Sequence, residues 1–187
     1  MPRSCNSKSA LIVCLLVVVC ATPAALAGAS LDIRPSTCPN LINRDVRGIL
    51  PVALVGDVDF VVSHVELASL ELSRADGVGG SVAPRHGQRR PFLARLVDIA
   101  APAVSGMCST FGADGIRDLR ILFGQAAVVS RLELGALAPN ATVEICLSGQ
   151  TTDGTSFSAC DHAIVTALSD LTPPEFRDIE TFPLRQK

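Results

Sequence analysis

The segment Thr151-Thr-Asp-Gly-Thr155 constrains the fold of this 187-residue chain more tightly than any other. It is typical of a type I turn followed by a left-handed glycine, the three-residue loop of a β-hairpin. In that register Cys146 lies directly opposite Cys160, with Cα atoms about 4.5 Å apart. We therefore expect a disulfide bond across the hairpin. A two-residue Asp-Gly turn would shift the register by one residue and place the two cysteines on a diagonal.

The first 27 residues have the three parts of a secretory signal peptide. Basic residues without an acid precede an apolar run at 10–20, and Ala25-Leu26-Ala27 forms a cleavage motif. The apolar run is shorter than the ~20 residues that cross a bilayer. We expect residues 1–27 to be removed, leaving a chain without a transmembrane segment that is secreted or held at the cell surface or in the periplasm. A retained anchor and a lipoprotein modified at Cys20 are the alternatives.

Four cysteines remain after that cleavage, and an even number in an exported chain is typical of disulfide bonds. With Cys146 joined to Cys160 across the hairpin, Cys38 pairs with Cys108 by elimination. Four free thiols or a metal site are the alternatives. The sequence has no C-x-x-C motif and no histidine at ligand spacing, which argues against zinc.

Charge and aromatic content exclude several kinds of binding. The full chain has 16 Lys and Arg residues against 18 Asp and Glu residues, and the signal peptide contains two of the basic ones. This acidic balance gives no reason to expect nucleic-acid binding. The chain has no Trp, no Tyr and only seven Phe, so it is short of the flat rings on which bases and most sugars stack. Any binding surface therefore depends on charges and the backbone.

Short apolar runs separated by turn residues recur along the mature chain. This pattern predicts an all-β fold, an Ig-like antiparallel β-sandwich of about seven short strands, over residues 28–168. Apolar spacing at 128–137 suits one short helix. Pro51 suggests an edge position or a bulge in its strand, and the acidic, proline-containing residues 169–187 predict a weakly ordered tail. The apolar runs lie at 31–33, 48–55, 61–65, 70–72, 92–99, 118–123, 142–149 and 157–165.

The segment LDIRPSTCPNLINRDVRGILPVALVGDVDFVVSHVELASLELS resembles a domain of many secreted bacterial proteins, with the pattern I-D-I-K-P-G-S-x-P-N-x-I-N, then G-x-x-P-V-A-I-L, then D-F-D-V. Asp98-Ile99, Asp114-Gly-Ile-Arg-Asp118-Leu and Asp153-Gly154 match later motifs, so the resemblance covers about residues 31–165. It implies an all-β module, often in tandem or joined to other extracellular domains. The matching residues of the first segment are Asp32, Ile33, Pro35, Pro39, Asn40, Ile42, Asn43, Gly48, Pro51, Val52, Ala53, Asp59 and Phe60.

Many members of that family carry D-x-N-x-D-G-x-x-D, which resembles a calcium loop. This chain has Thr110 and Gly112 at the first two ligand positions, so Asp114 and Asp118 remain, with Asp98 as a further candidate. Calcium is bound by six to eight oxygens, so the resemblance implies at most a weak calcium site, and no other cofactor is expected. In the alternative, Asp114 makes an Asx-type turn and Asp118 opens a strand.

A second candidate site is a basic loop. Residues 74–91 combine glycines, prolines and charges and predict a surface loop. Within it, Arg85, His86, Arg89 and Arg90 could contact an acidic protein or a polysaccharide. A loop that is simply solvated is the alternative.

Sequence motifs of catalysis are missing. The chain has no G-x-S-x-G, no H-E-x-x-H and no P-loop. Ser63-His64 and Asp161-His162 are sequence neighbours, and neighbouring side chains of a strand point to opposite faces. We therefore predict a secreted, non-catalytic β-sandwich module with a structural or interaction role at the cell surface or in the extracellular matrix. A small extracellular hydrolase with a site assembled across loops is the alternative.

Overall fold

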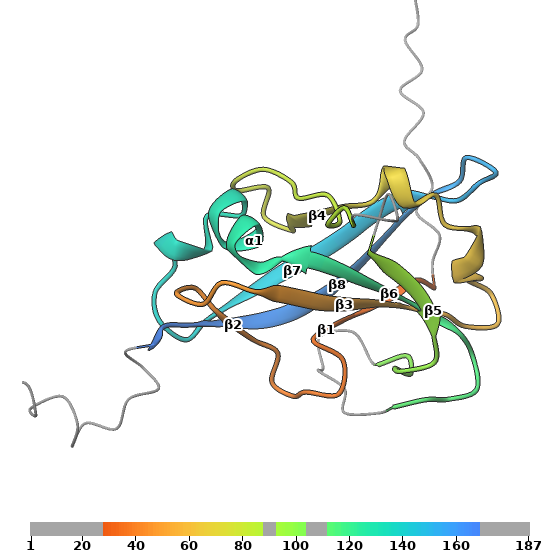
Figure 1. The fold of residues 1–187 in the computed structure, drawn as a ribbon, viewed down its shortest axis with the longest axis horizontal. Helices are drawn as coiled ribbons and strands as arrows, with labels where there is room; N and C mark the ends of the chain where they lie inside the picture. The colour runs from red at the N-terminus through yellow and green to blue at the C-terminus, as the bar shows by residue number, and fades with distance from the viewer. Residues whose placement is uncertain (1–27, 88–92, 104–111, 169–187) are drawn as a thin grey trace, which may run out of the picture.

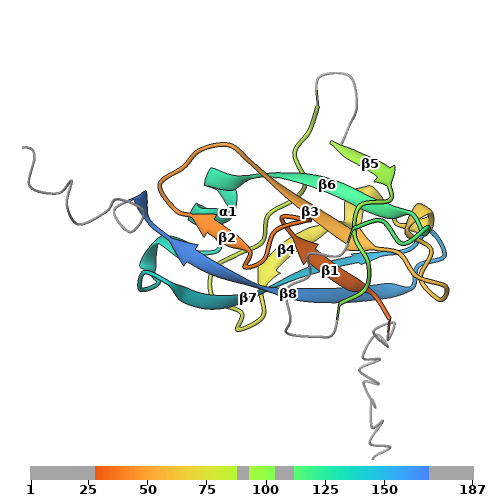
Figure 2. The same ribbon diagram turned by 90° about the horizontal axis from the view of Figure 1, so that it is seen from below.

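The computed structural model describes residues 28–87, 93–103 and 112–168, which form two four-stranded sheets and one α-helix. Seen from below, the sheets lie in two layers, as a β-sandwich requires (Figure 2). Sheet A has the strand order β1 (Ser30–Ile33), β3 (Ile49–Val55), β6 (Asp118–Gly124) and β5 (Ala94–Val97). Sheet B has the order β2 (Leu41–Asn43), β8 (Ser156–Thr166), β7 (Ala141–Gln150) and β4 (Glu71–Arg74).

Alternation of side chains along the strands builds one main core between the sheets. Every second residue of β3 and of β7 is buried in the same hydrophobic cluster. The rings of Phe60 and Phe157 meet edge to face there, with centroids 5.2 Å apart. The rest of the cluster is mainly aliphatic, as a chain without Trp and Tyr requires. These alternating residues are Leu50, Val52 and Leu54 in β3, and Val143, Ile145 and Leu147 in β7.

The β7–β8 hairpin has the register predicted from its turn. The Thr151 N–H donates to the Thr155 carbonyl oxygen at 2.9 Å, and Gly154 is left-handed with a φ of 86°. Cys146 pairs directly with Cys160, their Cα atoms are 4.0 Å apart, and the disulfide bond is formed. The prediction of a disulfide across this hairpin is confirmed.

Several other predictions concern residues outside the described ranges. Cys38 is disulfide-bonded, but its predicted partner Cys108 lies outside these ranges, as do residues 1–27 and 169–187. The pairing, the signal peptide and the tail therefore stay predictions. Within the described ranges, no helix has the length and apolar character needed to cross a membrane.

Three local predictions are corrected. The sheets are not antiparallel throughout, because β2 runs parallel to the end of β8. The valine cluster at 61–65 contains a 3-10 helix, η1 (Val62–His64), followed by η2 (Leu67–Ser69), rather than a strand. The helix expected within 128–137 is α1 (Gln125–Arg131), with a separate 3-10 turn, η3 (Leu134–Ala136), after it (Figure 1).

Pro51 lies in a central strand rather than at an edge, which the sequence did not predict. Strand β3 has β1 on one side and β6 on the other, and Pro51 pairs with Leu122 of β6. On the other side, β1 ends at Ile33, opposite Val52. The Pro51 carbonyl oxygen accepts the Arg34 N–H at 2.9 Å, so the position that lacks an N–H faces the side where β1 has ended. No ladder hydrogen bond is lost, because the strand is locally an edge there.

Candidate functional site: a cationic face on sheet A

Two arginines lie side by side on the outer face of sheet A. In β6, Leu119, Ile121 and Phe123 are buried in the core, so the alternating Arg120 points outward. Arg95 of β5 is its direct cross-strand partner. Both arginines are exposed.

Neither arginine is neutralised by an acid of the described part of the chain. The ion pair found in these residues joins Arg74 to Asp76, in and just after β4. Like charges directly opposite each other on a sheet are destabilising. The Arg95–Arg120 pair therefore lowers the stability of sheet A, and an anion bound between the two guanidinium groups would remove that penalty.

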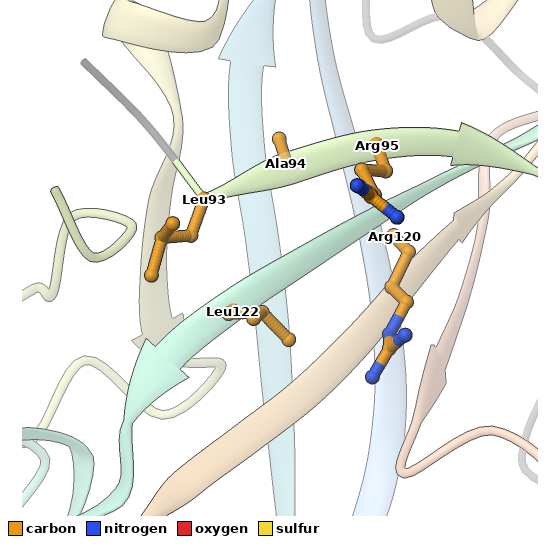
Figure 3. A pocket seen from close by; sticks show the side chains of 5 residues that line it. All are labelled: Leu93, Ala94, Arg95, Arg120 and Leu122. Atoms are coloured by element: carbon orange, nitrogen blue, oxygen red, sulfur yellow. The ribbon is translucent and has the colours of Figure 1, made fainter. Parts of the chain in front are cut away.

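A hollow of about 180 Å³ opens at this pair. Figure 3 shows that the two guanidinium groups lie at one end and the leucine side chains at the other. The leucines are half-buried, so they offer apolar surface next to positive charge. A ligand with an anionic group beside an apolar one would fit this arrangement. The lining residues are Leu93, Ala94, Arg95, Arg120 and Leu122.

Arg85, the first of the four basic residues predicted in the loop, lies at the same hollow. The Arg85 N–H donates to the Leu122 carbonyl oxygen at 2.8 Å, and the Leu93 N–H donates to the Arg85 carbonyl oxygen at 2.8 Å. Arg85 and His86 are exposed. The other two residues of the predicted loop, Arg89 and Arg90, lie outside the described residues. The sequence thus identified the rim of this site but not its centre.

The candidate calcium ligands Asp98 and Asp114 organise a turn. The Asp98 carboxylate accepts hydrogen bonds from the Asp114 and Gly115 N–H groups, each at 3.0 Å. Asp114 accepts the Ile116 N–H at 2.9 Å, which is the Asx turn of the alternative reading. The candidate ligand position at Thr110 falls outside the described residues. The calcium site therefore stays a prediction.

Asp118, the third candidate ligand, opens β6 and is fully buried. One of its oxygens accepts the Gly56 N–H at 3.1 Å, and the other accepts the Ile99 and Ala100 N–H groups at 2.8 and 2.9 Å. This carboxylate ties the segment after β5 to the end of β3. Across the described ranges, no three His, Cys, Asp or Glu side chains are grouped so that they could hold a metal ion.

A buried polar group at the junction of the two sheets was missed by the sequence reading. Asp161 of β8 accepts the Ile33 N–H of β1 and the Asn40 side-chain N–H, each at 2.8 Å. Burial raises the pKa of Asp161. The sequence did contain a signal for this buried acid, because Asp161 lies between Ala159 and Ala163 in the series of alternating buried residues of β8.

Asp32 is the second buried acid of this junction. It lies on the outer side of β1, opposite Ala53, and both its carboxylate oxygens are buried without a hydrogen-bond partner among the described residues. Burial, together with the negative charges of Asp161 and Asp118, raises its pKa to about 7. Asp32 is therefore protonated over much of the acidic range, where a free carboxyl group would be charged.

Comparison with family models, with curated proteins and with solved structures gave no match. The resemblance to the secreted bacterial domain thus stays a prediction from the motifs.

Proposed function

We propose that the chain is a secreted, non-catalytic interaction module of the cell surface or extracellular matrix, built as an Ig-like β-sandwich, that binds an anionic partner on the outer face of sheet A. The observation that carries this proposal is the cross-strand pair of Arg95 and Arg120, which has no acid to neutralise it among the described residues. Such a pair costs stability in the free protein. A bound carboxylate, sulfate or phosphate group would turn this cost into affinity.

Composition supports the same conclusion. The sequence has no Trp or Tyr, and the phenylalanines of the described residues, Phe60, Phe123 and Phe157, are buried. Recognition by the described surface therefore depends on charge and the backbone rather than on aromatic stacking. The apolar surface of Leu93 and Leu122 beside the arginines adds contact area for an adjoining nonpolar group. Calcium has a minor place in the proposal, as a weak ligand of the loop that contains Asp98 and Asp114.

Binding to two anionic polymers, polyglutamate and heparin, tests the proposal. The variant Arg95→Ala/Arg120→Ala removes both guanidinium groups and is expected to weaken binding at least about tenfold, since charge-assisted hydrogen bonds contribute roughly 1.5–3 kcal/mol each. The matched control, Arg47→Ala/Arg131→Ala, removes two exposed arginines elsewhere and the same net charge. If both double variants lose affinity equally, the anionic polymers respond to the total charge of the protein, and the proposed site is wrong.

A further inference from the structure

Among the described residues, strand β5 forms an open edge of sheet A. The Leu122 N–H donates to the Leu93 carbonyl oxygen at 3.0 Å, which fixes the residues of β5 that bond to β6. Since the backbone groups of an edge strand alternate in direction, Ala94 and Leu96 direct their N–H and C=O groups away from β6. No described residue bonds to these groups. Leu96 is also 41% exposed.

At each of the three other sheet edges, backbone groups are already bonded to described residues. On β1, the Ile33 N–H donates to the Asp161 carboxylate. On β4, Leu72 exchanges two hydrogen bonds of 2.9 Å with Val82. On β2, the Asn43 carbonyl oxygen accepts the Gln125 side-chain N–H at 2.7 Å. Edge strands are usually covered or blocked in this way, because free backbone groups template the addition of another strand.

The open edge has a hollow on each face of the sheet. The outer one is the arginine hollow described above. The inner one, of about 160 Å³, includes Leu96 and Val61, which is 50% exposed. A strand added to β5 would direct alternate side chains to the two faces. The residues that line the inner hollow are Asp57, Phe60, Val61, Val62, Ser63, Leu96, Ile116 and Arg117.

We propose, building on the function above, that the anionic partner is an extended polypeptide segment with alternating acidic and apolar residues, which adds to β5 as a further strand of sheet A. Its acidic side chains pair with Arg95 and Arg120, and its apolar side chains contact Leu96 and Val61. Main-chain hydrogen bonds to Ala94 and Leu96 supply affinity, and the two hollows supply specificity, as in other cases of strand addition.

Charge identifies the kind of strand that fits. A second copy of this chain, paired through its own β5, would bring Arg95 of each copy to the same small interface, and these like charges repel. On the inner face, Asp57 and Arg117 offset each other in charge, so the exposed apolar side chains of Leu96 and Val61 favour an apolar partner there. A polysaccharide could satisfy the arginines but carries no regular row of N–H groups for the C=O groups of Ala94 and Leu96. A segment with alternating acidic and apolar residues supplies acids for the arginines, apolar side chains for the inner hollow and N–H groups for the edge of β5.

A synthetic peptide, Ac-(Val-Glu)4-NH2, is the probe for this strand, and its affinity for the full mature chain is measured by isothermal titration calorimetry. Two matched peptides carry N-methyl groups either on every valine or on every glutamate. In an added strand, the N–H groups of one residue type face β5 and those of the other face solvent. We expect one methylated peptide to bind at least about tenfold more weakly, as loss of its main-chain hydrogen bonds requires. The other should bind like the unmodified peptide.

A protein variant gives an independent readout. In Leu96→Pro the N–H that faces the open edge is removed, while the ladder to β6 keeps its hydrogen bonds. We expect this variant to lose peptide binding and to retain heparin binding. Leu96→Ala keeps the N–H and loses only side-chain contact, so it should weaken peptide binding to a smaller extent than Leu96→Pro. Circular dichroism checks that both variants are folded.

The outcomes separate this inference from the function on which it rests. If heparin binds through Arg95 and Arg120 but the peptide does not, or if both methylated peptides bind like the unmodified one, strand addition is wrong and the anion site remains. If neither ligand depends on the two arginines, both proposals fall. A dimer of the mature chain that Leu96→Pro dissociates would show that a second copy occupies the edge, and would also overturn the inference.

Discussion

The carboxylate of Asp161 in β8 accepts a hydrogen bond of 2.8 Å from the backbone N–H of Ile33 in β1, a residue 128 positions away in the sequence. This contact joins the edge of sheet A to the inner side of sheet B. Strand β1 is an edge that no strand of the described residues covers, and the Asp161 side chain gives its buried Ile33 N–H a hydrogen-bond partner.

Replacing this carboxylate tests its role in stability. We expect Asp161→Ala to lower the free energy of unfolding by about 2–4 kcal/mol, because the N–H groups of Ile33 and Asn40 both lose their acceptor in a buried site. Urea unfolding measures the change. Asp59→Ala, at an exposed position, is the control and should change stability by less than about 0.5 kcal/mol. A loss no larger than that of the control would contradict the role assigned to Asp161.

Stability should fall as the pH rises from about 4 to about 7. The pKa of Asp32 is raised from 3.8 to about 7 in the folded protein, so the folded state binds a proton that the unfolded state has released in this window. Asp32→Asn removes this proton binding. We expect the variant to match the parent near pH 4 and to be more stable by about 1–3 kcal/mol at pH 8.

Urea unfolding at several pH values measures this difference. Some pH dependence should remain in Asp32→Asn, because burial also raises the pKa of Asp161. Parallel curves for the two proteins between pH 4 and 8 would show that Asp32 does not titrate as proposed.

A methyl group at position 56 should be strongly destabilising. A Cβ atom on Gly56 would overlap the carbonyl oxygen of Arg117, and the Gly56 N–H is one of the donors that hold Asp118. We expect Gly56→Ala to lower the unfolding free energy by roughly 2–4 kcal/mol. Gly48→Ala is the matched control, because nothing lies within 4 Å of the added carbon there. Equal thermal midpoints for the two variants would refute the close approach.

Removal of the hairpin disulfide should cost about 3 kcal/mol. Cys146 and Cys160 close a loop with a sequence separation of 14 residues, and a loop of this length corresponds to roughly that contribution on the chain-entropy model. Cys146→Ser/Cys160→Ser is compared with the parent by denaturant unfolding.

Peptide mapping without reductant checks the predicted link between Cys38 and Cys108. A peptide that joins Cys38 to any other cysteine would contradict that pairing.

The turn at Asp98 offers a test of the calcium prediction. Weak calcium binding by this loop, as proposed, should raise the thermal midpoint of the parent protein relative to a sample with chelator, and Asp98→Ala should lose this rise. Because the Asp98 carboxylate also accepts two backbone N–H groups, the variant should melt below the parent even with the chelator. A parent midpoint that calcium leaves unchanged would contradict the calcium site.

The contrast between the two ends of the chain shows what a sequence can predict. The β7–β8 register followed from a turn whose chemistry fixes the pairing, so Cys146 and Cys160 could be placed residue by residue. Strand β2 has three residues, which is too short for periodicity to reveal, and its parallel partner is far away in the sequence. The valine cluster at 61–65 had the composition of a strand but contains a 3-10 turn over Val62–His64.

The candidate site was predictable only in part, for a related reason. Arg85 was identified because a run of basic residues in a loop is visible in the sequence. Arg95 and Arg120 each stood in a predicted strand, but their pairing depends on a register between strands that no short turn connects. The open edge of β5 is a property of the whole sheet order and has no local signal.

The convergence of Arg85 and Leu93 on Leu122 has a consequence for how this surface can diversify. Because the hydrogen bonds of these two residues anchor the chain at one point of β6, the sequence between them can be exchanged or lengthened without changing the register of sheet A. The segment between Arg85 and Leu93 is thus separable from the sheet to which it is anchored. A library of loop sequences grafted between Arg85 and Leu93 could alter the choice of ligand while the sheet that presents it stays the same.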